Sequence, residues 1–156
     1  MSVFAGLKVL DVASYIAAPA AATLLADFGA HVVKVEGPEG GGFPRTTLKP
    51  NLAYSDHNYL WMQGARGRRG IALDLKKPEA QAVLHRLVRE ADVLITNYPP
   101  PVRRRLGLEW PRLRELNPRL IYASLTGYGE TGPEANKPGF DATTYWARSG
   151  LADLTR

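Results

Sequence analysis

Several polar and basic side chains occupy positions in the sequence where they could bind an anionic ligand. Lys76, Asn97 and Tyr98 directly follow short apolar segments typical of buried strands, Arg105 comes a turn later, and the pair Phe140-Asp141 lies beyond the last such segment. A guanidinium group binds phosphate through paired, charge-assisted hydrogen bonds, and an ammonium group supplies a compact positive charge. Together these residue types are compatible with a phosphorylated adenine cofactor as the ligand.

Each of these residues also has a purely structural interpretation. Lys76 is consistent with a lysine that precedes a helix, Asn97 with a turn residue and Arg105 with a solvated helix charge. Asp141 is consistent with the N-cap of a helix that continues through Ala147. Residue types and spacing alone therefore indicate a soluble α/β domain that binds an anion at the ends of its strands.

Other common chemistries lack their sequence signatures. The three histidines are scattered and there is no cysteine, so we expect no metal site. The first strand is followed by ASYIAAPAAA rather than a glycine-rich dinucleotide loop, and neither a P-loop nor a G-x-S-x-G nucleophile motif is present.

The elements that must position these residues alternate along the chain. Apolar runs predict strands over residues 7–12, 31–36, 70–75, 92–96 and 120–125. Between them, helices are predicted from Pro19 to Gly29, from Pro78 to Ala91 and over residues 103–116, and a Gly- and Pro-rich loop over residues 36–51. Alternation of this kind predicts an α/β fold with a parallel sheet covered by helices on both faces. Ligands of such sheets bind beyond the carboxyl ends of the strands, where the polar residues above are expected.

Composition agrees with one globular domain and an anionic partner. The chain has 156 residues, a formal net charge of +5 and several arginine clusters, which suit a solvated basic face, a phosphorylated ligand or nucleic acid. Nucleic acid is disfavoured because aromatic residues do not alternate with the basic ones and no known nucleic-acid-binding motif occurs. Without cysteines, a signal sequence or a membrane-spanning apolar run, a cytoplasmic location is expected.

Five blocks of the sequence resemble, in order and spacing, the N-terminal portion of the class III CoA-transferases. The family includes formyl-CoA transferase, the carnitine and bile-acid CoA-transferases and α-methylacyl-CoA racemase. The blocks are GLKVLDVASYIAAPAAATLLADFGAHVVKVEGPEGG, RRGIALDLKKPEA, ADVLITNYPPPVRRRLGL, LNPRLIYASLTGYGETGP and KPGFDATTYWARSGL. They cover nearly the whole chain.

The resemblance implies a Rossmann-like large domain, a smaller second domain and an interlocked homodimer. Residues 1–138 would form part of the CoA-binding large domain, and residues 139–156 the start of the active-site wall and of the inter-domain linker, which is truncated there. By position, the resemblance assigns residues to CoA as follows: Leu73 and Lys76 at the adenine end, Asn97 and Tyr98 in the cofactor channel, Arg105 at the phosphates, and Ile16 where formyl-CoA transferase has a glutamine.

The resemblance also implies covalent catalysis by an aspartate that attacks the acyl-CoA thioester. That aspartate follows a glycine and lies beyond the position of Phe140-Asp141, so no catalytic residue is expected within these 156 residues. Neither Asp141 nor Asp153 stands in the matching motif, and we expect the 156-residue chain to be unable to complete a CoA transfer by itself.

Departures from the family pattern carry further expectations. Phe140 replaces the histidine that serves the racemases as a base, which favours transfer over racemisation. Ile16 indicates a less polar acyl group, while Phe140 and Asp141 would line the substrate pocket. Gly37 replaces a common basic residue, whose cofactor contact would be missing or supplied by Arg45 or Arg68.

Three hypotheses remain open at this point: part of a CoA-transferase enzyme, a CoA-binding subunit that relies on a partner chain for the nucleophile, and, least favoured, a nucleic-acid-binding domain. The first two share every motif in the chain.

Overall fold

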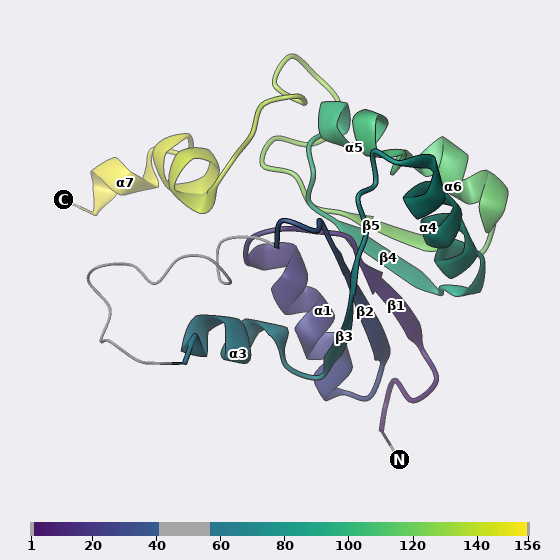
Figure 1. Cartoon of the computed structure of the whole chain (residues 1–156). Helices are drawn as coiled ribbons and strands as arrows, with labels where there is room; N and C mark the ends of the chain where they lie inside the picture. Colours follow the sequence, from purple (N-terminus) through teal and green to yellow (C-terminus); the bar gives the residue numbers. More distant parts are fainter. Residues whose placement is uncertain (1, 41–56, 156) are drawn as a thin grey trace.

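A computed structural model, which describes residues 2–40 and 57–155, contains a five-stranded parallel sheet (Figure 1). The strands are β1 (Lys8–Asp11), β2 (His31–Glu36), β3 (Arg68–Ala72), β4 (Val93–Thr96) and β5 (Ile121–Ser124). They lie in the order β3-β2-β1-β4-β5, and all four pairings are parallel. This arrangement confirms the predicted α/β class and places β1 at the centre of the sheet.

Helices cover both faces of the sheet (Figure 1). One face packs against α1 (Ala17–Asp27), which also contacts α3 (Tyr59–Ala65). The other face is covered by α4 (Pro78–Glu90), α5 (Pro100–Leu106) and α6 (Trp110–Leu116). Because α4 buries Ala80, Leu84 and Val88 at helical spacing, its apolar stripe lies against the sheet.

Alternation of side chains along the strands divides the core into two clusters. Val9 and Val32 point to the α1 side with Ala18 and Ala22, whereas Leu10 points to the α4 side. The central strand therefore contributes to both clusters through Val9 and Leu10, while Lys8 at its start is exposed and Asp11 at its end is buried.

Several predicted boundaries differ from the structure. The third strand begins at Arg68 and ends at Ala72 instead of spanning residues 70–75, and the first helix begins at Ala17, before Pro19. The helical region predicted over residues 103–116 is two helices separated by a left-handed turn at Gly107, whose φ is 66°. Helix α3 is an addition that the sequence pattern does not predict, and most of the loop predicted over residues 36–51 lies outside the described residues.

The last residues extend away from the sheet (Figure 1). A π-helix, η1 (Ala142–Ala147), follows Asp141, and α7 (Leu151–Leu154) comes next. Asp141 is the N-cap of η1, but its side chain donates or accepts no capping hydrogen bond. None of the helices among residues 2–40 and 57–155 is long and apolar enough to cross a membrane.

Candidate functional site

The order of the strands creates a switch point between β1 and β4. The chain leaves β1 through α1 towards β2 on one side, and it later returns through α4 to β4 on the other side. In open parallel sheets the crevice at such a point, beyond the carboxyl ends of the strands, is the usual ligand site. The loops that follow β1, β3, β4 and β5 meet at this edge and carry most of the residues singled out above.

Asn97 ties two of these loops together. Its side-chain amide accepts a hydrogen bond from the Ser14 backbone N–H at 2.8 Å and donates one to the Ser14 carbonyl at 2.7 Å. The loop after β1 is thereby held against the end of β4. Asn97 thus uses both halves of its amide on the protein itself, so its contribution to a ligand site is at least partly to position the loop that follows β1.

Tyr15, the next residue in that loop, has an unusual backbone conformation. Its φ is 65°, which makes it the non-glycine residue with positive φ among those described. Its ring packs edge-to-face on Phe140, with the centroids 5.4 Å apart and the planes at 63°. The loop after β1 therefore contacts the segment that follows β5, although the two lie far apart in the sequence.

The segment before Phe140 approaches the loop after β5 very closely. A Cβ atom at Gly139 would stand 3.0 Å from Gly127 Cα and 2.4 Å from Thr144 Cγ2. Because there is no room for a side chain between these backbones, both glycines are needed for Phe140 to reach Tyr15.

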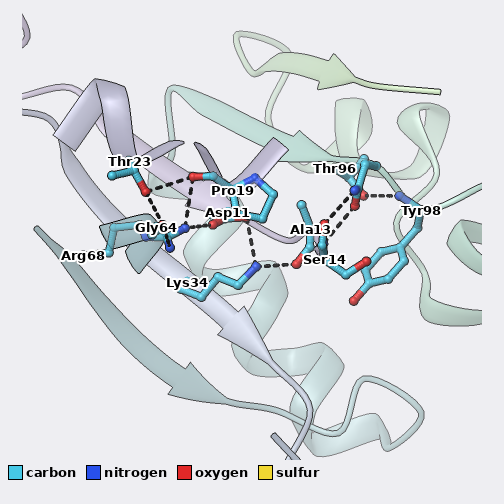
Figure 2. A network of polar contacts seen from close by, with 11 residues as sticks. Asp11, Ala13, Ser14, Pro19, Thr23, Lys34, Gly64, Arg68, Thr96 and Tyr98 are labelled. Atoms are coloured by element: carbon cyan, nitrogen blue, oxygen red, sulfur yellow. Dashed lines mark hydrogen bonds and ion pairs between the residues drawn. The ribbon is translucent and has the colours of Figure 1, made fainter. Parts of the chain in front are cut away.

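A buried ion cluster lies beneath the loop after β1 (Figure 2). The carboxylate of Asp11, at the end of β1, accepts hydrogen bonds from Lys34 Nζ at 3.1 Å and from Arg68 Nη1. All three side chains are at most 8% exposed. Removing a charge from water is costly unless it is paired, so the three residues depend on one another.

The same cations hold backbone carbonyls in place (Figure 2). Lys34 donates to the Ala13 carbonyl, while Arg68 donates to the carbonyls of Pro19 at 3.3 Å and Gly64 at 2.5 Å. The Thr23 hydroxyl, which has one hydrogen to donate, lies within hydrogen-bond distance of both of these carbonyls, at 3.0 Å from Pro19 and 2.6 Å from Gly64. The cluster therefore fixes the loop after β1, the first turn of α1 and the end of α3 relative to the sheet.

Burial shifts the pKa of two groups near this edge. It lowers the pKa of the Lys34 ammonium, and the neighbouring Asp11 carboxylate offsets part of that effect. Burial, reinforced by the charges of Asp11 and Glu36, raises the pKa of the Tyr98 hydroxyl. Tyr98 is therefore protonated at neutral pH and able to donate a hydrogen bond.

Arg103 anchors the end of β5. This buried guanidinium donates to the Tyr98 carbonyl, to Ser124 Oγ and to Glu130 Oε1, each at 2.5 Å. Ser124 also donates to the same oxygen of Glu130. The contacts join α5, the end of β5 and the loop that leads to Phe140.

Replacing Glu130 with glutamine is expected to flatten the acid limb of the stability profile. Hydrogen bonds from Ser124 and then from Arg103 lower the pKa of Glu130 below its ordinary value of 4.5. A carboxyl group with a lowered folded-state pKa stabilises the fold above pH 4.5, and this contribution is lost as the pH falls towards the folded-state value. Urea unfolding between about pH 3 and pH 7 would measure this dependence.

In that experiment the stability difference between the wild type and Glu130→Gln should shrink as the pH falls. Glu115→Gln is a suitable control, because Glu115 is exposed and its carboxylate has no hydrogen-bond or ion-pair partner among the described residues. A difference that stays constant from neutral to acid pH would contradict the assignment.

Two cavities open at this edge of the sheet. The larger, about 370 Å³, lies between α1 and α3 and is lined by Tyr15, Ile16 and Trp61 among others, with Lys34 and Arg68 at its polar part. The smaller, about 230 Å³, is lined by Ala17, Asn97 and the segment that carries Phe140 and Asp141. A ligand at the switch point would have both cavities within reach.

The structure groups the residues selected from the sequence into three sets. Asn97, Phe140 and Asp141 line the smaller cavity, and Ile16, 52% exposed, lines the larger one. Leu73 and Tyr98 are half-buried and pack on the α4 side of the core. Lys76 and Arg105 are exposed, and within the described part of the chain their side chains have no hydrogen-bond or ion-pair partner.

Sequence reasoning missed the residues that hold this site together, namely Asp11, Tyr15, Lys34 and Arg103. A signal existed for two of them, because a charged residue within an otherwise apolar strand, as at Asp11 and Lys34, indicates a buried partner of opposite charge. Nothing in the residue type distinguishes Arg103 from the exposed Arg104 and Arg105 beside it.

Known proteins resemble the chain over nearly its full length. Succinate–glutarate CoA-transferase of Agrobacterium fabrum is 44% identical over 96% of this chain and 38% of that protein. Cinnamoyl-CoA:phenyllactate CoA-transferase of Clostridium sporogenes is 38% identical over 97% of this chain and 37% of that protein. The chain thus spans under two fifths of the length of these curated relatives.

Solved structures agree with the fold. The Mycobacterium tuberculosis protein Rv3272 superposes with a TM-score of 0.85 and 35% identity, over 97% of this chain and 40% of that one. A CaiB/BaiF family protein from Brucella suis gives a TM-score of 0.83 and 36% identity, over 96% of this chain and 39% of the other. The model of the family described as CoA-transferase family III matches residues 4–156, and the chain therefore belongs to that family, the class III CoA-transferases.

Proposed function

We propose that the protein transfers coenzyme A from an acyl-CoA thioester to a free carboxylic acid, and that these residues form much of its CoA cradle. The observation that carries the proposal is the match of the family over residues 4–156, which includes every loop at the carboxyl edge of the sheet. The named relatives are CoA-transferases, among them a succinyl-CoA–L-malate CoA-transferase beta subunit of Chloroflexus aurantiacus at 44% identity.

The geometry supports a place for the nucleotide end of CoA. Lys76 follows β3 and Arg105 lies on α5, and both present unpaired cations to solvent among the described residues. Exposed, unpaired cations can bind phosphate without breaking an existing ion pair. The guanidinium of Arg105 can in addition donate hydrogen bonds to two phosphate oxygens at once. In this proposal Leu73 and Lys76 flank the adenine end, and Arg105 binds the phosphates.

The pantetheine arm would then run along the carboxyl edge towards the switch point. Asn97 and Tyr98 lie at the end of β4, where Tyr98 is half-buried and protonated at neutral pH. Ile16 lies on the other side of the edge, and Phe140 with Asp141 closes the smaller cavity. These residues form the channel and the wall of the substrate pocket in the proposal.

The chemistry we propose uses an aspartate that is not among these residues. Its carboxylate oxygen attacks the thioester carbonyl, the C–S bond breaks, and CoA leaves as a thiolate with a mixed anhydride left on the enzyme. The thiolate then attacks the aspartyl carbonyl, which releases the donor acid and gives an enzyme-bound CoA thioester. The acceptor carboxylate reverses the two steps and takes up CoA.

The proposal includes an organisation for the whole protein. Residues 1–138 belong to the CoA-binding large domain, and residues 139–156 begin the active-site wall and the inter-domain linker. A homodimer in the cytoplasm, without a metal, accords with the family. Two aromatic residues of η1, Tyr145 and Trp146, are 58% and 43% exposed and offer apolar surface for contacts between the two subunits.

A CoA-binding subunit that takes its nucleophile from a partner chain is the second candidate. It is favoured by one observation, that two of the relatives from Chloroflexus aurantiacus are named as the alpha and beta subunits of succinyl-CoA–L-malate CoA-transferase. Racemisation is less favoured, because Phe140 offers no proton-transferring group where the racemases carry a histidine. Nucleic-acid binding has no support beyond the basic composition.

The test uses the protein as its gene encodes it. The purified protein would be incubated with an unlabelled acyl-CoA panel and ¹³C-labelled carboxylic acids, and mass spectrometry would follow the label into new acyl-CoA. If the protein alone forms the labelled thioester, the hypothesis of a complete enzyme is supported. If the labelled thioester forms only after a partner chain is added, the hypothesis of a CoA-binding subunit is supported. Absence of CoA binding by calorimetry, together with salt-sensitive binding of duplex DNA, would overturn both.

A further inference from the structure

The loop after β1 presents a row of exposed apolar side chains to the switch point. Tyr15 is 37% exposed and Ile16 is 52% exposed, while Phe140, which stacks edge-to-face on Tyr15, is 54% exposed. Large apolar side chains that gather at a crevice usually contact a partner or ligand. Here they come from two loops that the sheet brings together.

Hydrogen bonds to the two residues before it fix the position of Tyr15. Its backbone has a φ of 65°, a conformation that a tyrosine rarely adopts, and Asn97 holds the preceding residue through two hydrogen bonds. Lys34 holds the carbonyl of Ala13 one residue earlier. An uncommon conformation that the surrounding contacts maintain points to a use for the ring it aims.

The aromatic pair stands between the two cavities. Tyr15 and Ile16 line the larger one, whereas Ala17 and Phe140 line the smaller one. The wall of the larger cavity is largely apolar and includes Pro19, Ala20, Leu24 and Trp61. Under the proposed placement of CoA, with Asn97 in its channel, an acyl chain would pass the Tyr15 ring to enter the larger cavity.

The cations that line both cavities are already paired with carboxylates. Each cation that lines either cavity is paired with a carboxylate among the described residues: Lys34 and Arg68 with Asp11, Arg66 with Asp27, and Lys137 with Glu134. Among the described residues that line the cavities, a second carboxylate on an acyl group would have to displace one of these pairs in order to be neutralised. An apolar acyl group needs no such exchange.

We infer that Tyr15, supported by Phe140, is a specificity-determining residue that selects acyl groups of apolar monocarboxylic acids, aromatic or branched, over those of dicarboxylic acids. The inference rests on the proposed function and adds the substrate class to it. Tyr15 acts by contact with the acyl group, and the remote nucleotide end of CoA is unaffected by it.

The experiment measures kcat/KM of the protein as its gene encodes it, with phenylacetyl-CoA and with succinyl-CoA, using one common acceptor acid. We expect the wild type to prefer phenylacetyl-CoA by about 10-fold or more, the range that apolar contacts give. Tyr15→Ala should reduce that ratio by roughly 10-fold, whereas Tyr15→Phe, which keeps the ring, should leave it close to the wild-type value.

Two further variants complete the design. Phe140→Leu removes the supporting ring and should lower the same ratio, so the test does not depend on how well Tyr15→Ala folds. Ile121→Ala is the control, because Ile121 is 62% exposed but begins β5, at the opposite edge of the sheet. The Kd for free CoA should be the same in all of these proteins.

The outcomes separate the two proposals. If no acyl-CoA of any class yields a labelled thioester, the proposed function is wrong. If transfer occurs but the wild type prefers succinyl-CoA, or if Tyr15→Ala lowers kcat/KM equally for both donors, transfer stands and Tyr15 does not determine specificity.

Discussion

Replacing Asp11 with asparagine is expected to lower the free energy of unfolding by about 3–5 kcal/mol. The substitution keeps the shape of the side chain and removes the anion that pairs with both Lys34 and Arg68, whose side chains are 8% and 3% exposed. Two buried cations would then face each other without their shared counter-ion. Since small domains are stable by only about 5–15 kcal/mol, much of the variant should be unfolded under mild denaturing conditions.

Urea unfolding would measure this effect, with Asp27→Asn as the matched control. Asp27 also pairs with an arginine, Arg66, at 2.5 Å, but its side chain is 32% exposed and that of Arg66 is 52% exposed. Pairs in contact with water contribute only about 0–1 kcal/mol. Equal losses in the two variants would show that the buried cluster has no special role in stability.

Replacing Arg105 with alanine is expected to raise the Kd for CoA by roughly 10- to 100-fold. Under the proposed function its guanidinium binds the CoA phosphates, and a hydrogen bond to a charged group contributes about 1.5–3 kcal/mol. Because the side chain is exposed, the fold should be unaffected. Calorimetric titration of the protein as its gene encodes it measures the Kd directly.

Arg104 provides a closely matched control for this experiment. It lies beside Arg105 on α5 and is likewise exposed, but the family pattern assigns it no contact with CoA. Arg104→Ala should leave the Kd within about 2-fold of the wild type, since a solvated charge at this distance is largely screened. If the two variants bind CoA equally well, Arg105 is a solvated helix charge and its assignment is wrong.

Dephospho-CoA, which lacks the 3′-phosphate, locates the contact further. If Arg105 binds that phosphate, the wild type should bind dephospho-CoA about as weakly as Arg105→Ala binds CoA. The substitution should then change the Kd for dephospho-CoA very little. If Arg105 binds the pyrophosphate, the substitution should weaken the binding of both ligands by similar factors.

Much of the sheet could be predicted because its strands are short apolar runs bounded by turn-forming residues. The run from His31 to Glu36 lies between Gly29 and Pro38, and the observed strand has the predicted bounds. Helix α4 likewise begins at Pro78, as its sequence indicates. Local signals sufficed where a turn residue closed each end of an element.

The third strand shows where local signals fail. It ends at Ala72 because Asp74 forms a turn, in which its side chain accepts from the Lys76 N–H and its carbonyl from the Lys77 N–H. It begins at Arg68 because that guanidinium is buried against Asp11, fifty-seven residues earlier. An arginine appears solvated in the sequence when its counter-ion lies on a distant strand.

The location of the candidate site could be predicted from the sequence, but the contacts that hold its loops in place could not. Parallel strands bring the residues after them to one edge, so the general location of Asn97, Phe140 and Asp141 followed from the topology. The partner of Asn97 is backbone of the loop after β1, and backbone partners leave no trace in residue type. No pattern in the sequence predicts the left-handed conformation of Tyr15 either.

The two hydrogen bonds between Asn97 and Ser14 have a thermodynamic consequence for ligand binding. Ordering a flexible loop costs roughly 1–2 kcal/mol of conformational entropy per residue. Since Asn97 and Lys34 already fix the loop of residues 12–16 in the absence of ligand, that cost belongs to folding. A ligand that docks at this edge meets a preorganised surface, and its contact energy is retained as affinity.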